Sequence, residues 1–236
     1  MARRDVLQER FFTSLISGHR GATRQIVDEL LSADHRPEKI LTHLFWPTVE
    51  HLQKLYREDQ LTNLAHHYAT RLLRSLVDQV QLQLEQQPRC GKTILLTCGP
   101  EESEELAGQI ACDLLEAGGY NVYFTGGGVA NDELVNEIGE METDVLVVFG
   151  AVPNTVPQTR LLIDRLRSIG VCPRLQIVVG GGVFNRADGL AQEIGADLWA
   201  KTPHELVQAI TKKPARRMPS EQRTVGRKRR IKRDAA

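Results

Sequence analysis

The sequence lacks the features that mark a secreted, membrane-spanning or disulfide-stapled protein. Its four cysteines are scattered and form no Cys-x-x-Cys pair, so neither a disulfide framework nor a structural zinc site is expected. The longest uncharged apolar run, Val145–Val156, is shorter than the ~20 residues that a membrane-spanning helix needs. Glu9 and Arg10 place charges where a signal peptide has its apolar stretch. We therefore expect a cytoplasmic protein with no membrane contact.

Net charge is absent too, because 30 Lys and Arg balance 30 Asp and Glu among 236 residues. The charges are nevertheless segregated: residues 211–236 carry +9 and the remaining residues carry −9. The basic residues of that segment are Lys212, Lys213, Arg216, Arg217, Arg223, Arg227, Lys228, Arg229, Arg230, Lys232 and Arg233. With so few large apolar residues, residues 212–236 are expected to form a disordered tail. Such a tail either contacts nucleic acid non-specifically or merely solubilises the chain, and both interpretations stay open.

At 41% apolar and 25% charged residues, the chain has the composition of a folded globular protein. Between residues 5 and 87, apolar residues recur every three or four positions, as in amphipathic helices. Breaks at Gly18, at Pro37 and before Leu61 separate four such segments. Four helices with short joints predict an antiparallel bundle, and residues 86–88 a linker.

From residue 92 onward, short β-prone runs alternate with helical stretches. The expected strands are residues 93–97, 121–125, 144–149, 175–179 and 197–199, with helices between them and from Pro203 on. The predicted fold class is therefore α/β, with an N-terminal four-helix bundle as a cap and a flavodoxin-like (Rossmann-like) five-stranded parallel sheet in residues 88–211. Ligands of such sheets bind outside the carboxyl ends of the strands.

Glycines gather at those carboxyl ends. They are Gly126, Gly127 and Gly128 after the second strand, Gly150 after the third, and Gly180, Gly181 and Gly182 after the fourth. Glycine allows a positive φ or a close approach of a ligand, although loops of this kind are rich in glycine in any case. No arrangement of nucleophile, base and oxyanion donors accompanies them, so binding without catalysis is expected.

A helical bundle followed by such a sheet resembles the cobalamin (vitamin B12)-binding module of methionine synthase, of corrinoid methyl carriers and of light-responsive, cobalamin-dependent repressors. The resemblance spans about residues 10–210 and is strongest at Leu175–Phe184 and Glu193–Trp199. In that family the paired glycines, here Gly180 and Gly181, let the nucleotide tail of cobalamin pass close to the sheet. The resemblance thus implies a cobalamin cofactor, or a related tetrapyrrole, beneath the helical cap.

The bundle carries part of the family's cap motif, a Trp followed after nine residues by Glu-His. The resemblance implies that Tyr56 replaces the Trp over the upper face of the corrin ring, that His66 replaces the Glu, and that His67 is retained. His67 is then a candidate upper ligand of cobalt. An ordinary pair of helix histidines is the alternative.

The family's lower axial ligand is missing. That ligand is the histidine of Asp-x-His-x-x-Gly after the first strand, and here Glu104 stands at its position. No histidine occurs between His67 and His204 that a small shift of the alignment could recruit. The family's Ser-x-Leu after the third strand reads Gly150-Ala151-Val152. Cobalamin is therefore expected either with its own benzimidazole on cobalt or not bound at all.

These observations favour a non-enzymatic sensor or regulatory module, for example in transcriptional regulation, that signals to a protein partner. A ligand-free interaction module on the same fold is the second hypothesis. A corrinoid carrier for methyl transfer is the third, because carrier chemistry depends on tuning of cobalt from below.

Overall fold

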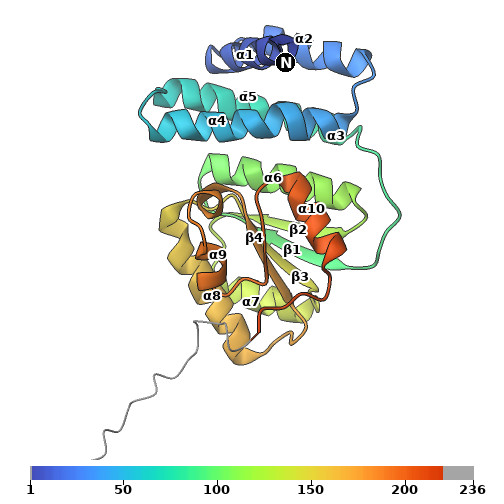
Figure 1. The fold of residues 1–236 in the computed structure, drawn as a ribbon, viewed down its shortest axis with the longest axis vertical. Coiled ribbons are helices and arrows are strands. Elements are labelled where there is room, and N and C mark those ends of the chain that lie inside the picture. Colours follow the sequence, from blue (N-terminus) through green and yellow to red (C-terminus); the bar gives the residue numbers. More distant parts are fainter. Residues whose placement is uncertain (1, 220–236) are drawn as a thin grey trace, which may run out of the picture.

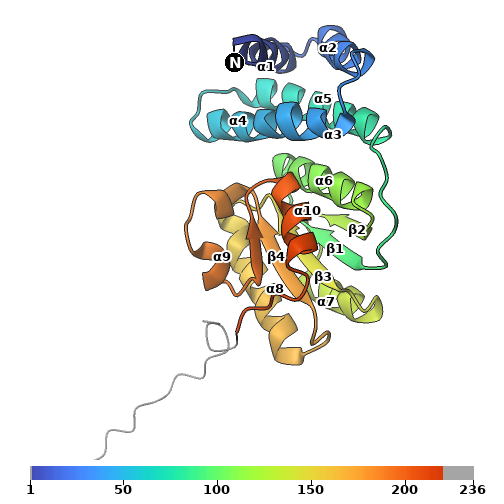
Figure 2. The same cartoon turned by 45° about the vertical axis from the view of Figure 1, so that its right-hand side comes forward.

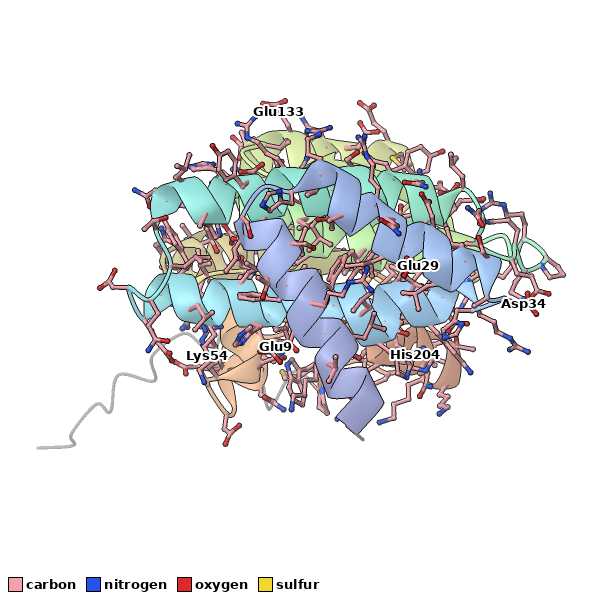
Figure 3. All side chains as sticks on the ribbon, turned by 90° about the horizontal axis from the view of Figure 1, so that it is seen from above. Glu9, Glu29, Asp34, Lys54, Glu133 and His204 are labelled. Atoms are coloured by element: carbon pink, nitrogen blue, oxygen red, sulfur yellow. The ribbon has the colours of Figure 1, made fainter. Side chains whose placement is uncertain are left out.

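The computed structural model describes residues 2–219 and places two layers of helices above an α/β domain (Figure 1). The cap consists of α1 (Ala2–Ile16), α2 (Arg20–Ser32), α3 (Pro37–Ile40), η1 (Leu41–Phe45), α4 (Trp46–Arg57) and α5 (Asn63–Gln81). The outer layer holds α1 and α2, and the inner layer holds α4 and α5. Seen from above in Figure 3, α1 lies across this inner layer.

All helices of the cap contribute to one apolar core, which also includes the upper face of α6 (Glu102–Ala117). Phe11 of α1 stacks on Phe45 with the ring centroids 5.5 Å apart. The buried hydroxyl of Thr23 donates to that of Ser14 over 2.9 Å, which satisfies two polar groups inside the core. Thr62 begins α5 as an N-cap by accepting from the N–H of Ala65. Periodic apolar spacing thus produced the helical cap that it predicted.

One continuous rod runs from α3 through the π turn η1 into α4. Pro47 has no N–H, so the carbonyl of His43 lacks its usual partner four residues on, and Gln8 Nε2 donates to it over 3.2 Å instead. The π turn ends between two aromatic residues with different environments. Phe45 packs in the cap core, whereas Trp46 packs in the core of the sheet.

All five strands pair in parallel, in the order β2-β1-β3-β4-β5. They are β1 (Thr93–Thr97), β2 (Asn121–Gly126), β3 (Val145–Phe149), β4 (Gln176–Gly180) and β5 (Leu198–Ala200). The connecting helices are α6 (Glu102–Ala117), α7 (Asn131–Glu140), α8 (Val156–Ile169), α9 (Leu190–Glu193) and α10 (Pro203–Lys212), with short turns η2 (Pro153–Thr155) and η3 (Gly182–Asn185). The predicted fold class is confirmed.

Each face of the sheet has its own core. On one face α6 and α10 pack against the strands together with Trp46 from the cap, and on the other face α7 and α8 do so. In Figures 1 and 2 alike, α6 lies between the inner cap layer and the sheet. Helix α9, which is the helix expected between the fourth and fifth strands, is only four residues long. In residues 2–219 no helix is long and apolar enough to cross a membrane.

The chain after α10 is attached to the sheet, although it lies within the expected tail. The buried carboxylate of Asp197 binds Arg167 and accepts from the N–H of Met218 over 2.7 Å. Met218 is itself buried, and Gln176 Nε2 donates to the carbonyls of Lys213 and Arg216. Residues 212–219 of the predicted tail are therefore held against the sheet, and residues 220–236 lie outside the described part of the chain.

Candidate functional site

Helices α4 and α5 pack on α6, whose first turn follows the loop at the carboxyl end of β1. Close backbone contacts join the loops at the carboxyl ends of the strands, and glycine is what permits them. A Cβ on Gly127 would lie 2.2 Å from the carbonyl oxygen of Gly99, and one on Gly182 would lie 2.2 Å from that of Ala151. The same Ala151 carbonyl accepts from the N–H of Val183 over 2.7 Å. These glycines thus have a structural reason to be there without any ligand.

Glu104 sits in the first turn of α6 and its side chain is fully buried. Its Oε1 accepts from the N–H of Val152 over 2.8 Å and from the hydroxyl of Thr155 over 3.3 Å. Its Oε2 accepts from the N–H of Glu101 over 3.1 Å, which forms one half of a reciprocal capping box. The carboxylate therefore ties the loop after β1 to the loop after β3.

The same carboxylate occupies the space above Gly99, where a Cβ would lie 2.0 Å from Glu104 Oε1. Burial raises the pKa of Glu104, while the donors from Val152 and Glu101 lower it. The residue predicted at the lower-ligand position is thus turned toward backbone donors. It is built into the loop structure rather than presented to the cap.

Tyr56 of α4 and His66 of α5 come together in the cap. Their rings stack with centroids 4.1 Å apart, and the Tyr56 hydroxyl donates to Asn63 Oδ1 over 2.8 Å. His66 is 7% exposed, and its Nε2 atom is buried without a hydrogen-bond partner. Burial, and then the neighbouring His67, lower the pKa of His66, so the ring is neutral at pH 7. A buried neutral imidazole with a free nitrogen is able to bind a ligand.

His67 points elsewhere. Its Nδ1 lies 3.3 Å from Glu102 Oε2 in the first turn of α6, and Arg71 of the cap approaches the same carboxylate. Two further polar contacts hold the cap on this turn: Arg74 pairs with Glu105 over 3.1 Å, and Gln53 donates to the carbonyl of Ser103 over 3.2 Å. The candidate upper ligand is therefore part of the contact between the cap and α6.

Two aromatic residues that the motif comparison missed lie at the centre of the site. Phe149 ends β3 and is fully buried, and Trp46 of the cap packs on it with the ring centroids 5.6 Å apart. A Cβ on Gly180 would lie 2.7 Å from the Phe149 ring, and one on Gly181 would lie 3.0 Å from it. The Phe149 ring thus covers both paired glycines. A bulky aromatic residue where a strand meets a glycine loop was the available sequence signal.

The remaining predicted site residues belong to the walls of these loops. The N–H of Gly150 donates to the carbonyl of Gly180 over 2.9 Å and so continues the pairing of β3 with β4. Gly126 ends β2 at a φ of 68°, with Glu105 as its nearest side chain. On the α7 and α8 side, a cavity of about 480 Å³ opens between the loops after β1, β2 and β3. Gly99, Pro100 and Thr155 line part of it.

Comparison with known proteins agrees with this architecture. Residues 7–81 match the family model of the B12 binding domain. The cap of this chain is thus similar to that domain. Dimethylamine corrinoid protein 3 of Methanosarcina mazei is 24% identical over 103 residues, which are 44% of this chain and 60% of that protein. A corrinoid protein of Desulfitobacterium hafniense is 26% identical over 122 residues, 52% of this chain and 55% of that protein.

Among solved structures, the monomethylamine corrinoid protein of Methanosarcina barkeri aligns with a TM-score of 0.74 at 15% identity. The alignment covers 88% of this chain and 98% of that one, so the two share a fold. The chain spans less than two thirds of the curated corrinoid relatives that it matches. The resemblance to cobalamin-binding modules is confirmed, whereas the sensor role, a regulatory partner, nucleic-acid contact and cytoplasmic location stay predictions.

The residues of the site fit one side of a corrinoid and not the other. On the cap side, the stacked pair of Tyr56 and His66 offers an aromatic face and a free imidazole nitrogen. On the sheet side, Glu104 is fully engaged and Phe149 occupies the space beside the paired glycines. A corrinoid with a protein histidine below cobalt and its nucleotide tail in the sheet therefore does not fit this arrangement.

Proposed function

We propose that this chain is a non-catalytic module that binds a corrinoid between the inner cap layer and the carboxyl ends of the strands, with no protein ligand below the metal. The family match of the cap and the names of the corrinoid relatives support the ligand class. One observation carries the rest: the Glu104 carboxylate is buried and accepts from Val152, Thr155 and Glu101. If a corrinoid binds, its metal is held from above or by the corrinoid's own base.

On the upper face we assign the contact to His66 rather than to His67. The Nε2 atom of His66 is buried and unpartnered, and a polar atom in that state costs free energy until it finds a partner. His67 already faces Glu102. A ligand that supplies a metal or a hydrogen-bond donor beside His66 would satisfy this atom.

A regulatory role follows from how the cap is held. The Gln53–Ser103 and His67–Glu102 contacts are 3.2 and 3.3 Å long, so these groups touch directly. A flat macrocycle between two protein surfaces needs about 3.5 Å to each. Binding beneath the cap must therefore separate contacts of this kind, which couples ligand binding to the position of the cap. A partner that binds the cap in only one of its positions would then respond to whether the ligand is bound.

The test is to titrate cob(II)alamin into the full chain labelled with isotopic histidine and to record paramagnetic resonance. We expect hyperfine coupling to unlabelled benzimidazole nitrogen, or to a labelled histidine whose coupling is lost in His66→Ala. Glu104→His is the positive control for a lower histidine, and Glu104→Gln is its matched variant without an imidazole. Histidine coupling that persists in His66→Ala would contradict the proposal, and failure of the chain to bind cob(II)alamin or other corrinoids would favour the ligand-free interaction module.

A methyl carrier is the second candidate, favoured by the names of the dimethylamine corrinoid relatives. Carriers hand the methyl group to partner enzymes, so their cobalt must cycle between oxidation states. A reductive titration separates the candidates, since a carrier treated with a low-potential electron donor reaches cob(I)alamin reversibly. With the corrinoid's own base below cobalt, we expect the wild-type chain to stay in the Co(II) state under those conditions, because an axial donor disfavours Co(I).

A further inference from the structure

The paired glycines of β4 adjoin a space that this chain fills from within. Phe149 is the last residue of β3 and has no exposed surface. A Cβ on Gly180 would lie 2.3 Å from the carbonyl oxygen of Ala200 and 2.7 Å from the Phe149 ring, and one on Gly181 would lie 3.0 Å from that ring. A side chain at Gly181 would therefore meet this ring first, and one at Gly180 would meet both the ring and the backbone of β5.

The ring is held in place from the other side by the cap. Trp46 is 3% exposed and meets Phe149 at an interplanar angle of 55°, a favourable tilted geometry for two aromatic rings. Ala107 of α6 and Ala200 of β5 complete the same core. Because packing surrounds the ring on all of these sides, Phe149 has little freedom to move aside while the cap is docked.

The indole of Trp46 carries a second, independent feature. Its Nε1 is buried without a hydrogen-bond partner, although a buried indole N–H usually finds one. The unpaired donor belongs to the cap and lies beside the filled space. A ligand that docks under the cap and presents a carbonyl would pair with Trp46 without entering the sheet.

We propose that Phe149, supported by Trp46, is a specificity determinant that keeps the nucleotide arm of a complete corrinoid out of the sheet. The ligand class is then a corrinoid recognised by its ring and ring amides, with no contribution from the arm. This inference rests on the proposed function, since it specifies the ligand of the same site. It makes cobinamide, the corrinoid without the nucleotide arm, as good a ligand as cobalamin.

The experiment compares the affinities of the full chain for cobinamide and cobalamin by calorimetry. Wild type should bind cobinamide at least as tightly as cobalamin. Phe149→Ala opens the space beside Gly180 and Gly181, so it should tighten cobalamin binding at least tenfold and leave cobinamide binding within threefold. Phe149→Val, which fills part of the space with a residue that favours strands, should change cobalamin binding in the same direction by a smaller factor.

Phe184→Ala is the matched control, because Phe184 is also a buried phenylalanine but packs on the opposite face of the sheet. It should lower the melting temperature without changing the ratio of the two affinities. Wild type that binds cobalamin tenfold more tightly than cobinamide would overturn the inference while leaving the proposed function intact. Failure of the wild type and both Phe149 variants to bind either corrinoid would overturn both.

Discussion

The two sides of the site differ in how their polar groups are satisfied. On the sheet side, the Glu104 carboxylate accepts from three donors and Phe149 fills the space beside the paired glycines. On the cap side, His66 Nε2 and Trp46 Nε1 are buried and unpaired. Groups that are already paired, such as Glu104, gain nothing from a ligand, whereas unpaired buried groups do. The comparison indicates that any recognition is carried by the cap.

The largest effect on the sheet side is expected from the removal of the Glu104 carboxylate. We expect Glu104→Ala to lower the free energy of unfolding by about 3 kcal/mol, because two partly buried backbone N–H groups lose their acceptor and a cavity replaces the buried carboxylate. Denaturation in urea measures the loss. Glu102→Ala, in the same turn but partly exposed and paired only with the cap, should lose less than about 1 kcal/mol. Equal losses in the two variants would mean that Glu104 does not hold the loops together.

A second contrast lies between the two ends of α6, since both ends meet the cap. Near the far end, Asp113 is buried close to Asp78 of the cap and Glu116, and burial, reinforced by these charges, raises its pKa to about 7. The folded state therefore holds this proton more tightly than the unfolded state does. The associated stability is complete below pH 4 and is lost as the pH rises through 7.

Asp113→Asn should abolish that loss. At pH 8 we expect the variant to be more stable than wild type by about 2 kcal/mol, since one pKa unit corresponds to ~1.4 kcal/mol and relaxation reduces the full effect. Below pH 4 the two proteins should unfold alike. Thermal unfolding at a series of pH values measures the difference, and an advantage that is the same at every pH would contradict the buried-proton explanation.

Within the cap, we expect substitutions of His66 and His67 to have smaller and opposite effects on ligand binding. His66→Ala should weaken cobalamin binding about tenfold, or ~1.4 kcal/mol, because it removes the unpaired nitrogen. His67→Ala removes a partner of Glu102 that the ligand must displace, so it should tighten binding slightly, by less than threefold. Calorimetry with both variants measures whether each substitution weakens or tightens cobalamin binding. If His67→Ala weakened binding and His66→Ala did not, the contact on the upper face of the corrinoid would be assigned to His67.

Much of this architecture was predictable from the sequence. Apolar spacing located the cap helices, and runs such as 93–97 and 144–149 located the strands, because helix and strand periods are local properties of the chain. The glycine runs marked the carboxyl ends of the strands correctly. They did not reveal that Gly127 and Gly182 serve contacts between loops, since the partner carbonyls come from distant segments.

The sequence by itself determined the fold class, the resemblance to cobalamin-binding modules and the absence of a histidine at the lower position. Only the tertiary structure decided what replaces that histidine, because the donors to Glu104 include Val152 and Thr155, 48 and 51 positions away. The same holds for Phe149, which is an ordinary strand residue until Trp46 and the paired glycines of β4 close around it. Period and composition act over a few residues, whereas satisfaction of buried groups depends on which segments the fold brings together.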